Sequence, residues 1–150
     1  KPRYFVELNK ASGDANPRDG VRGGFDPLYP STHDKLGLTD LFTWTNVVHF
    51  RTGAGLALAP KVTVGAAYNS YWLANQRDGL YVGGKIVARS ADGSAGKHIG
   101  RQADVQAAFN LTKTTQVNAG YGRLFPGEFL LHATGGVPYN LVFCNVAQRF

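Results

Sequence analysis

One stretch of alternating residues, 41–74, constrains the fold of this chain more than any other part of it. Its two arms follow a strict two-residue period around a turn at residues 59–61, which predicts a β-hairpin with side chains on opposite faces. The polar face of the first arm carries His49 and Arg51. The opposite face is uncharged and consists of Val48, Phe50, Thr52, Ala54, Leu56 and Leu58. Such a hairpin suits a wall between an apolar medium and water.

The same alternation recurs along the chain and predicts an antiparallel up-and-down meander. We expect about six long strands, near residues 3–11, 47–58, 62–71, 98–111, 115–125 and 139–150, with short extra strands near 80–82 and 85–88. Short turns at 59–61 and 112–114 alternate with long connections at 12–40, 75–97 and 126–138. Outer-membrane β-barrels have this asymmetry, with short periplasmic turns and long extracellular loops. The predicted fold is therefore all-β and part of a transmembrane barrel.

Most titratable side chains of the predicted strands fall on the polar face. The side chains predicted to face the barrel interior, and so to lie along a substrate path, are Glu7, His49, Arg51, Asp104 and Arg149. These charges are nearly balanced in sign, so they either form a selective pore or pair with each other in a packed wall.

Arg101 and Arg123 break the pattern, because both fall in the apolar phase close to the long-loop ends. If the second hairpin places them side by side, they are suited to contact lipid or lipopolysaccharide phosphates. Alternatively, a β-bulge turns one of them to the other face.

Composition excludes several classes of protein. No apolar run approaches the roughly 20 residues of a membrane helix, and the 19 glycines favour strands and loops over helices. The net charge of +6 is spread too evenly to indicate a nucleic-acid surface. Conventional catalytic motifs are missing, so we expect no enzyme and no cofactor. We expect no metal either, although Asp14, Asn16 and Asp19 leave a loop calcium site as an alternative.

Several motifs in order resemble the bacterial alginate export family of outer-membrane barrels. They are GFDPLYP at 24–30, HDK at 33–35 with Gly37, YWLA at 71–74, ARS at 88–90, GSAGKHIG at 93–100, GY at 120–121 and FPGEF at 125–129. The terminal strand also resembles a barrel-assembly signal, with Phe150 preceded by apolar residues at alternate positions and Gln148 as a departure.

The resemblance implies that residues 1–150 are one barrel segment, the C-terminal part of a larger barrel. Six strands cannot close a barrel, so a longer chain is expected to supply the N-terminal strands. The chain has no methionine and no signal peptide, which also indicates a processed or partial chain.

The family implies an integral protein of the bacterial outer membrane. The expected function is a channel for passive passage of anionic polysaccharide or small anionic solutes. Its partners would be outer-membrane lipid, the remaining strands of the same protein and anionic polysaccharide, without nucleic acid. The alternative is a structural or surface-binding barrel in a larger assembly, without selective transport.

Overall fold

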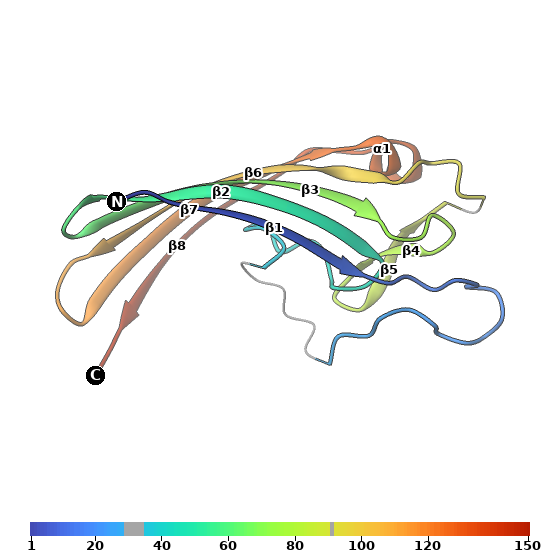
Figure 1. Cartoon of the computed structure of the whole chain (residues 1–150), viewed down its shortest axis with the longest axis horizontal. Helices are drawn as coiled ribbons and strands as arrows, with labels where there is room; N and C mark the ends of the chain where they lie inside the picture. The colour runs from blue at the N-terminus through green and yellow to red at the C-terminus, as the bar shows by residue number, and fades with distance from the viewer. Residues whose placement is uncertain (29–34, 91) are drawn as a thin grey trace.

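The computed structural model describes residues 1–28, 35–90 and 92–150. Its regular secondary structure is almost entirely β-strand, with one short helix (Figure 1). The elements in chain order are β1 (Arg3–Ala11), β2 (Val47–Ala59), β3 (Val62–Leu73), β4 (Gly79–Val82), β5 (Lys85–Arg89), β6 (His98–Asn110), β7 (Thr115–Pro126), α1 (Glu128–Thr134) and β8 (Tyr139–Gln148).

Six strands form one antiparallel sheet in the order β1-β2-β3-β6-β7-β8. Apart from the excursion through β4 and β5, each strand pairs with its neighbour in the sequence, so the meander predicted from the alternation is confirmed. The β2–β3 and β6–β7 connections are tight, and both chain termini lie at this short-turn end of the curved sheet (Figure 1). The predicted short strands are confirmed as β4 and β5, which form a separate hairpin at the other end.

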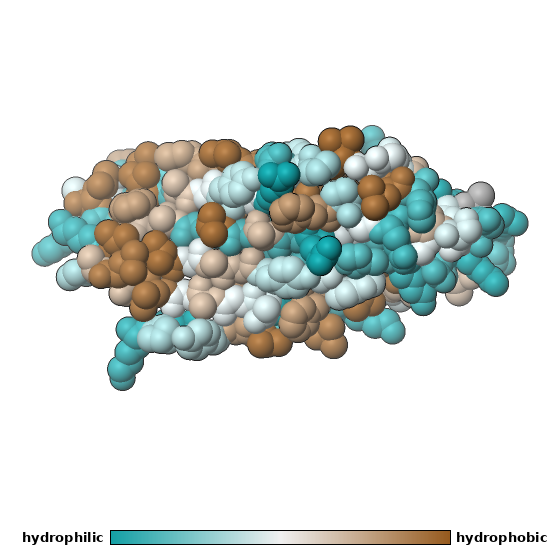
Figure 2. All heavy atoms as spheres, turned by 90° about the horizontal axis from the view of Figure 1, so that it is seen from above, coloured by the Kyte–Doolittle hydropathy of each residue, from teal (hydrophilic) through white to brown (hydrophobic). Residues whose placement is uncertain are grey.

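The sheet has a convex face and a concave face that differ in chemistry. Large apolar side chains stand exposed on the convex face, such as Val6 at 71% and Val105 at 51%, whereas His49 on the concave face is fully buried. Seen from above, the convex face gathers hydrophobic residues at the short-turn end and hydrophilic ones at the long-loop end (Figure 2). The two faces match the two phases of the sequence pattern, as period-two geometry requires.

Two features at the long-loop end were not predicted. The connection at 126–138 contains the helix α1, which ends at Gly135 in the left-handed conformation (φ 77°). Residues 35–46, named here the inward segment, run beneath the sheet on its concave side (Figure 1). The hairpin arm proper starts at Val47, so the first residues of the predicted 41–74 stretch belong to this segment instead.

The sheet is open at both sides. Within the described residues β1 pairs only with β2, and β8 only with β7. A sheet that crosses a bilayer must satisfy the backbone groups of its edges, which a closed barrel does. The six strands are therefore a segment of a barrel wall.

Candidate functional site

A row of hydrogen-bonded polar side chains crosses the concave face of four strands. Asn9 Nδ2 donates to His49 Nδ1 (3.3 Å), and His49 Nε2 lies 3.0 Å from Asn69 Oδ1. Asn69 Nδ2 then donates to Asp104 Oδ2 (2.8 Å). The other carboxylate oxygen, Asp104 Oδ1, accepts from Gln102 Nε2 (2.7 Å). This order of donors assigns the His49 proton to Nε2. Because every member has a partner, the row is a rigid layer rather than a set of separate charges.

The inward segment covers this polar row. The amide of Leu38 donates to Asp104 Oδ2 (3.3 Å), and Thr39 Oγ1 donates to Gln102 Oε1. The Tyr71 hydroxyl donates to the carbonyl of Leu36 (2.7 Å). Three backbone or side-chain bonds therefore tether the segment to β3 and β6, which explains why His49, Asn69 and Gln102 are fully buried on a face that would otherwise meet water.

Aromatic stacking completes the contact between the segment and the sheet. The ring of Tyr71 stacks on His49 with centroids 4.8 Å apart and planes 7° apart. Phe42 of the segment packs on the same tyrosine at 4.6 Å. Tyr71 thus joins the segment to the polar row by its ring and by its hydroxyl.

Basic side chains lie beside this covered region. Arg3, Arg51 and Gln106 line a cavity of about 170 Å³ together with Leu38 and Asp104. The guanidinium of Arg51 lies 4.9 Å from the Phe5 ring. Glu7 is opposite Arg51 in the β1–β2 register. The concave face therefore presents a mixed, predominantly hydrogen-bonding surface with two arginines next to the inward segment.

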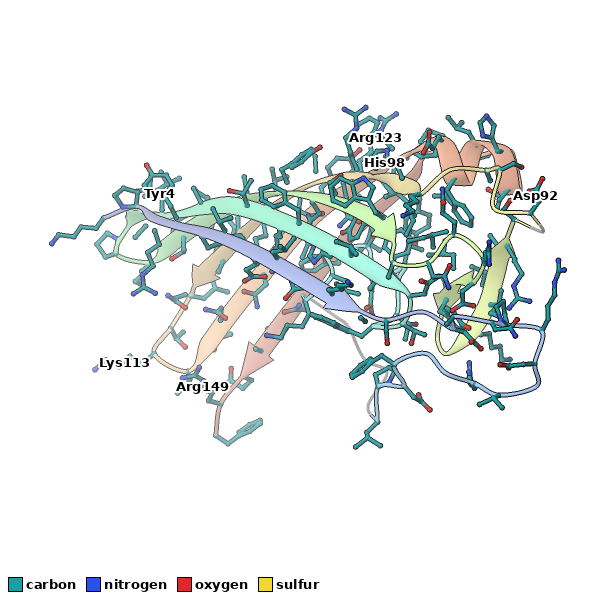
Figure 3. All side chains as sticks on the ribbon, turned by 45° about the vertical axis from the view of Figure 1, so that its right-hand side comes forward. Tyr4, Asp92, His98, Lys113, Arg123 and Arg149 are labelled. Carbon is teal, nitrogen blue, oxygen red and sulfur yellow. The ribbon has the colours of Figure 1, made fainter. Side chains whose placement is uncertain are left out.

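Four of the residues predicted for the substrate path share this concave face: Glu7, His49, Arg51 and Asp104. Arg149 follows the end of β8 at the short-turn end, where its amide donates to the Thr114 carbonyl (2.9 Å), and its place on the substrate path stays a prediction (Figure 3).

Sequence reasoning did not single out Arg3, Asn69 or Gln102 as site residues. The phase of Glu7 could have indicated Arg3, four residues earlier on the same face of the strand. Nothing in the sequence indicated that Leu38 and Thr39 would dock on the sheet.

Described residues of the connections 12–40 and 75–97 form a loop layer organised around Asp78. Its buried carboxylate accepts from the amides of Asp14 (2.8 Å) and Gly79 (2.6 Å) and from the Tyr81 hydroxyl (2.9 Å), and Arg89 lies 3.7 Å away. Burial raises the pKa of the Tyr81 hydroxyl above its ordinary value, and the bond to Asp78 adds to this. The layer is therefore a folded unit that supports the end of the sheet.

The residues considered for calcium take part in turns. Asp14 Oδ1 accepts from the Asn16 amide (3.0 Å), and Asp19 Oδ1 accepts from the Val21 amide (2.9 Å). Among the described residues, no three His, Cys, Asp or Glu side chains gather in a way that could hold a metal ion. Asp92 has a similar role, since hydrogen bonds from Ser94 and Ser90 lower the pKa of its carboxyl to about 2.

Arg101 and Arg123 both lie on the convex face. The β6–β7 register runs unbroken and pairs Arg101 with Phe125 and Arg123 with Ala103. The two arginines are therefore diagonal neighbours rather than directly opposite. The nearby irregularity in the β3–β6 ladder, between Tyr71 and Trp72, turns neither arginine to the concave face.

Comparison with known proteins agrees with this architecture. No described helix is both long and apolar enough to cross a membrane. No curated protein matches the chain. Residues 29–34, which include the end of the GFDPLYP motif and the first two residues of the HDK motif, lie outside the described part of the structure. The family model described as Alginate export matches residues 1–145 of the 150-residue chain. An open six-stranded meander with a polar concave face and an apolar convex face is thus the wall of a barrel of this kind, and the chain belongs to the alginate export family.

Proposed function

We propose that this chain is part of the wall of an outer-membrane channel that passes anionic polysaccharide or small anionic solutes passively. Family membership supports the general role in export. The observation that carries the finer proposal is the cavity on the concave face, where Arg3 and Arg51 lie beside the tethered inward segment. In this reading the arginines meet the passing anion at the point where the segment narrows the path.

The chemistry of the concave face fits this role. The oxygens of Asp104 accept hydrogen bonds from three N–H donors, namely the Leu38 amide and the side chains of Asn69 and Gln102. Such bonds hold the carboxylate in place and satisfy its oxygens within the wall of the cavity. A pore for polyanions needs a local excess of positive charge, which Arg3 and Arg51 supply here.

The proposal places the convex face against outer-membrane lipid and the long connections outside the cell. Further strands of the same, longer protein would pair with β1 and β8 and close the barrel. The activity is transport down a gradient and includes no catalytic step and no cofactor.

The test is conductance of the full-length protein in planar bilayers, with alginate added on one side. Alginate should block the current, and Arg3→Gln/Arg51→Gln should weaken this block at least tenfold, since even one charged hydrogen bond contributes about 1.5–3 kcal/mol. Lys113→Gln, in the tight β6–β7 turn, removes a positive charge elsewhere and should leave the block unchanged. A current that ignores alginate in the unmodified protein would refute the anionic substrate.

A second candidate is a structural or surface-binding barrel without selective transport. The position of Glu7 opposite Arg51 in the β1–β2 register favours it, because a packed wall places opposite charges next to each other. The same measurement separates the two candidates. A full-length barrel that inserts but carries no current would support the structural role.

A further inference from the structure

The convex face carries an unusual positive band. Within the six described strands, the charged residues in this phase are Lys10, Arg101 and Arg123, all near the long-loop end, and none is acidic. Arg101 is the fourth residue of β6, and Arg123 is the fourth from the end of β7. Both side chains are exposed, and Arg123 projects outward from the sheet (Figure 3).

A charged side chain on a lipid-facing surface needs either a counter-charge or a position near the polar interface of the bilayer. An arginine at the midplane of the bilayer costs about 2–4 kcal/mol, and this cost falls to about 0–1 kcal/mol near the interface. At about 3.4 Å per residue, the two arginines lie roughly 10 Å along the strand from the long-loop end. Because β6 has 13 residues and the apolar band of an outer-membrane barrel is about 25 Å tall, we expect a position this close to the strand end to lie near the edge of that band, at the level of the lipid phosphates.

The spacing of the two arginines suits one phosphate. Diagonal neighbours on adjacent antiparallel strands lie about 7–8 Å apart, within reach of two long side chains. The guanidinium of Arg123 already lies 5.0 Å from the ring of Phe125, which restricts its position. Two guanidinium groups match the charge of about −1.5 to −2 on a phosphate monoester better than the single charge of a phosphodiester.

An apolar groove lies directly beside the arginines, on the side away from the loops. Its volume is about 690 Å³. Tyr121, two residues from Arg123 on the same face of β7, lies along it, with Tyr4 of β1 on the far side. Between them the lining combines alanines at 54, 66, 107 and 119, which leave space, with the apolar side chains of Leu56, Val64 and Val105. A groove of this shape and chemistry accepts a hydrocarbon chain.

We propose that this convex surface binds one acylated sugar phosphate of the outer leaflet, of the lipid A class. Its phosphate monoester lies between Arg101 and Arg123, and one acyl chain lies in the groove. In this proposal the long-loop end of the sheet faces the outer leaflet, where this class of lipid is found. This location favours lipid A over a phospholipid as the ligand. The proposal depends on the outer-membrane location and not on what the channel carries.

The test measures binding of lipid A to the full-length protein in detergent by native mass spectrometry. Arg101→Gln/Arg123→Gln should weaken binding at least tenfold, because it removes both phosphate contacts. The matched control, Lys61→Gln/Lys113→Gln, removes two charges from the short turns and should bind as the unmodified protein does. Ala107→Phe fills the groove, keeps both arginines and should also weaken binding.

Other outcomes would overturn the proposal. Unchanged affinity in the arginine variant would exclude the phosphate site, and phosphatidylglycerol bound as tightly as lipid A would exclude the monoester. Arg101→Lys/Arg123→Lys keeps the charges if the glutamine variant fails to fold, and it should retain most of the binding. Because the measurement is of lipid binding, a barrel that carries no current would not affect its outcome.

Discussion

At the scale of single residues, Asp78 holds the loop layer together. It is fully buried and connects Asp14, which follows β1, with Tyr81 of the β4–β5 hairpin. A buried carboxylate is tolerated only where its oxygens are satisfied, and here two amides and a hydroxyl do so. Arg89 is 39% exposed, so its ion pair contributes less than these bonds.

Replacing Asp78 with alanine should release the hairpin. The substitution leaves the buried amides of Asp14 and Gly79 without an acceptor, and hydrogen bonds to a charged group contribute about 1.5–3 kcal/mol each. We expect local opening to become easier by about 3 kcal/mol, which is roughly 100-fold faster amide exchange in β4 and β5. Hydrogen-exchange mass spectrometry of the full-length protein measures this.

Asp19→Ala is the matched control for this variant. Asp19 is an exposed acid in the same layer and holds only its own turn, through the amide of Val21. Exchange in β4 and β5 should stay as in the unmodified protein. If the amides of β4 and β5 exchanged equally fast in the Asp78→Ala and Asp19→Ala variants, Asp78 would not be what organises the layer.

At the scale of elements, the inward segment depends on Gly37. This residue has a φ of 89°, a region in which side chains other than glycine are strained. A Cβ at this position would also meet the side chains of Gln102 and Tyr71, the two residues that tether the segment. Only glycine therefore lets the backbone approach the sheet this closely.

Gly37→Ala should displace the segment. The left-handed conformation alone costs an alanine about 1–2 kcal/mol, and the clash with Gln102 and Tyr71 adds to it. We expect the Leu38 amide, which donates to Asp104, to exchange at least tenfold faster. The measurement is amide exchange of the full-length protein, resolved to the peptide that contains Leu38.

Gly20→Ala tests whether backbone strain alone has this effect. Gly20 has a similar φ of 79°, with nothing within 4 Å of the added carbon. It should leave the Leu38 amide protected. If both variants exposed Leu38, close contact with the sheet would not be what positions the segment.

The alternating pattern predicted the strands because, in a strand, the polarity of each residue indicates which face of the sheet it lies on. The β2–β3 pair is present as predicted. The pattern could not predict α1, whose seven residues hold too little periodicity and which is fixed by burial of Phe129 among core residues. The inward segment was missed for a related reason. Leu36 and Leu38 are buried through contacts with strands more than 30 residues away, and local sequence carries no trace of such contacts. The arginine positions were predictable by phase, whereas the groove beside them required the structure.

At the scale of the whole molecule, the two ends of the sheet should lie on opposite sides of the outer membrane. Lys85→Cys, in the β4–β5 hairpin, should react with a membrane-impermeant maleimide on intact cells, whereas Lys113→Cys, in the β6–β7 turn, should not. Both are made in a Cys144→Ser background, because Cys144 is exposed. Labelling on intact and on lysed cells measures the sidedness.

Lysed cells supply the control, since there both cysteines should react. Labelling of Lys113→Cys but not Lys85→Cys on intact cells would reverse the orientation. That result would also move the two arginines of the convex face into the inner leaflet.

The tethering of the inward segment has a consequence for the order in which the protein assembles. The segment precedes its docking partners in the chain, since Tyr71, Gln102 and Asp104 all come later, on β3 and β6. Its own hydrogen bonds thus wait for strands made after it, separated by up to 66 residues. Once the barrel is sealed, the concave side can be reached only through its two mouths. The segment must then be drawn in while the wall is still open, or enter through the outer mouth after closure.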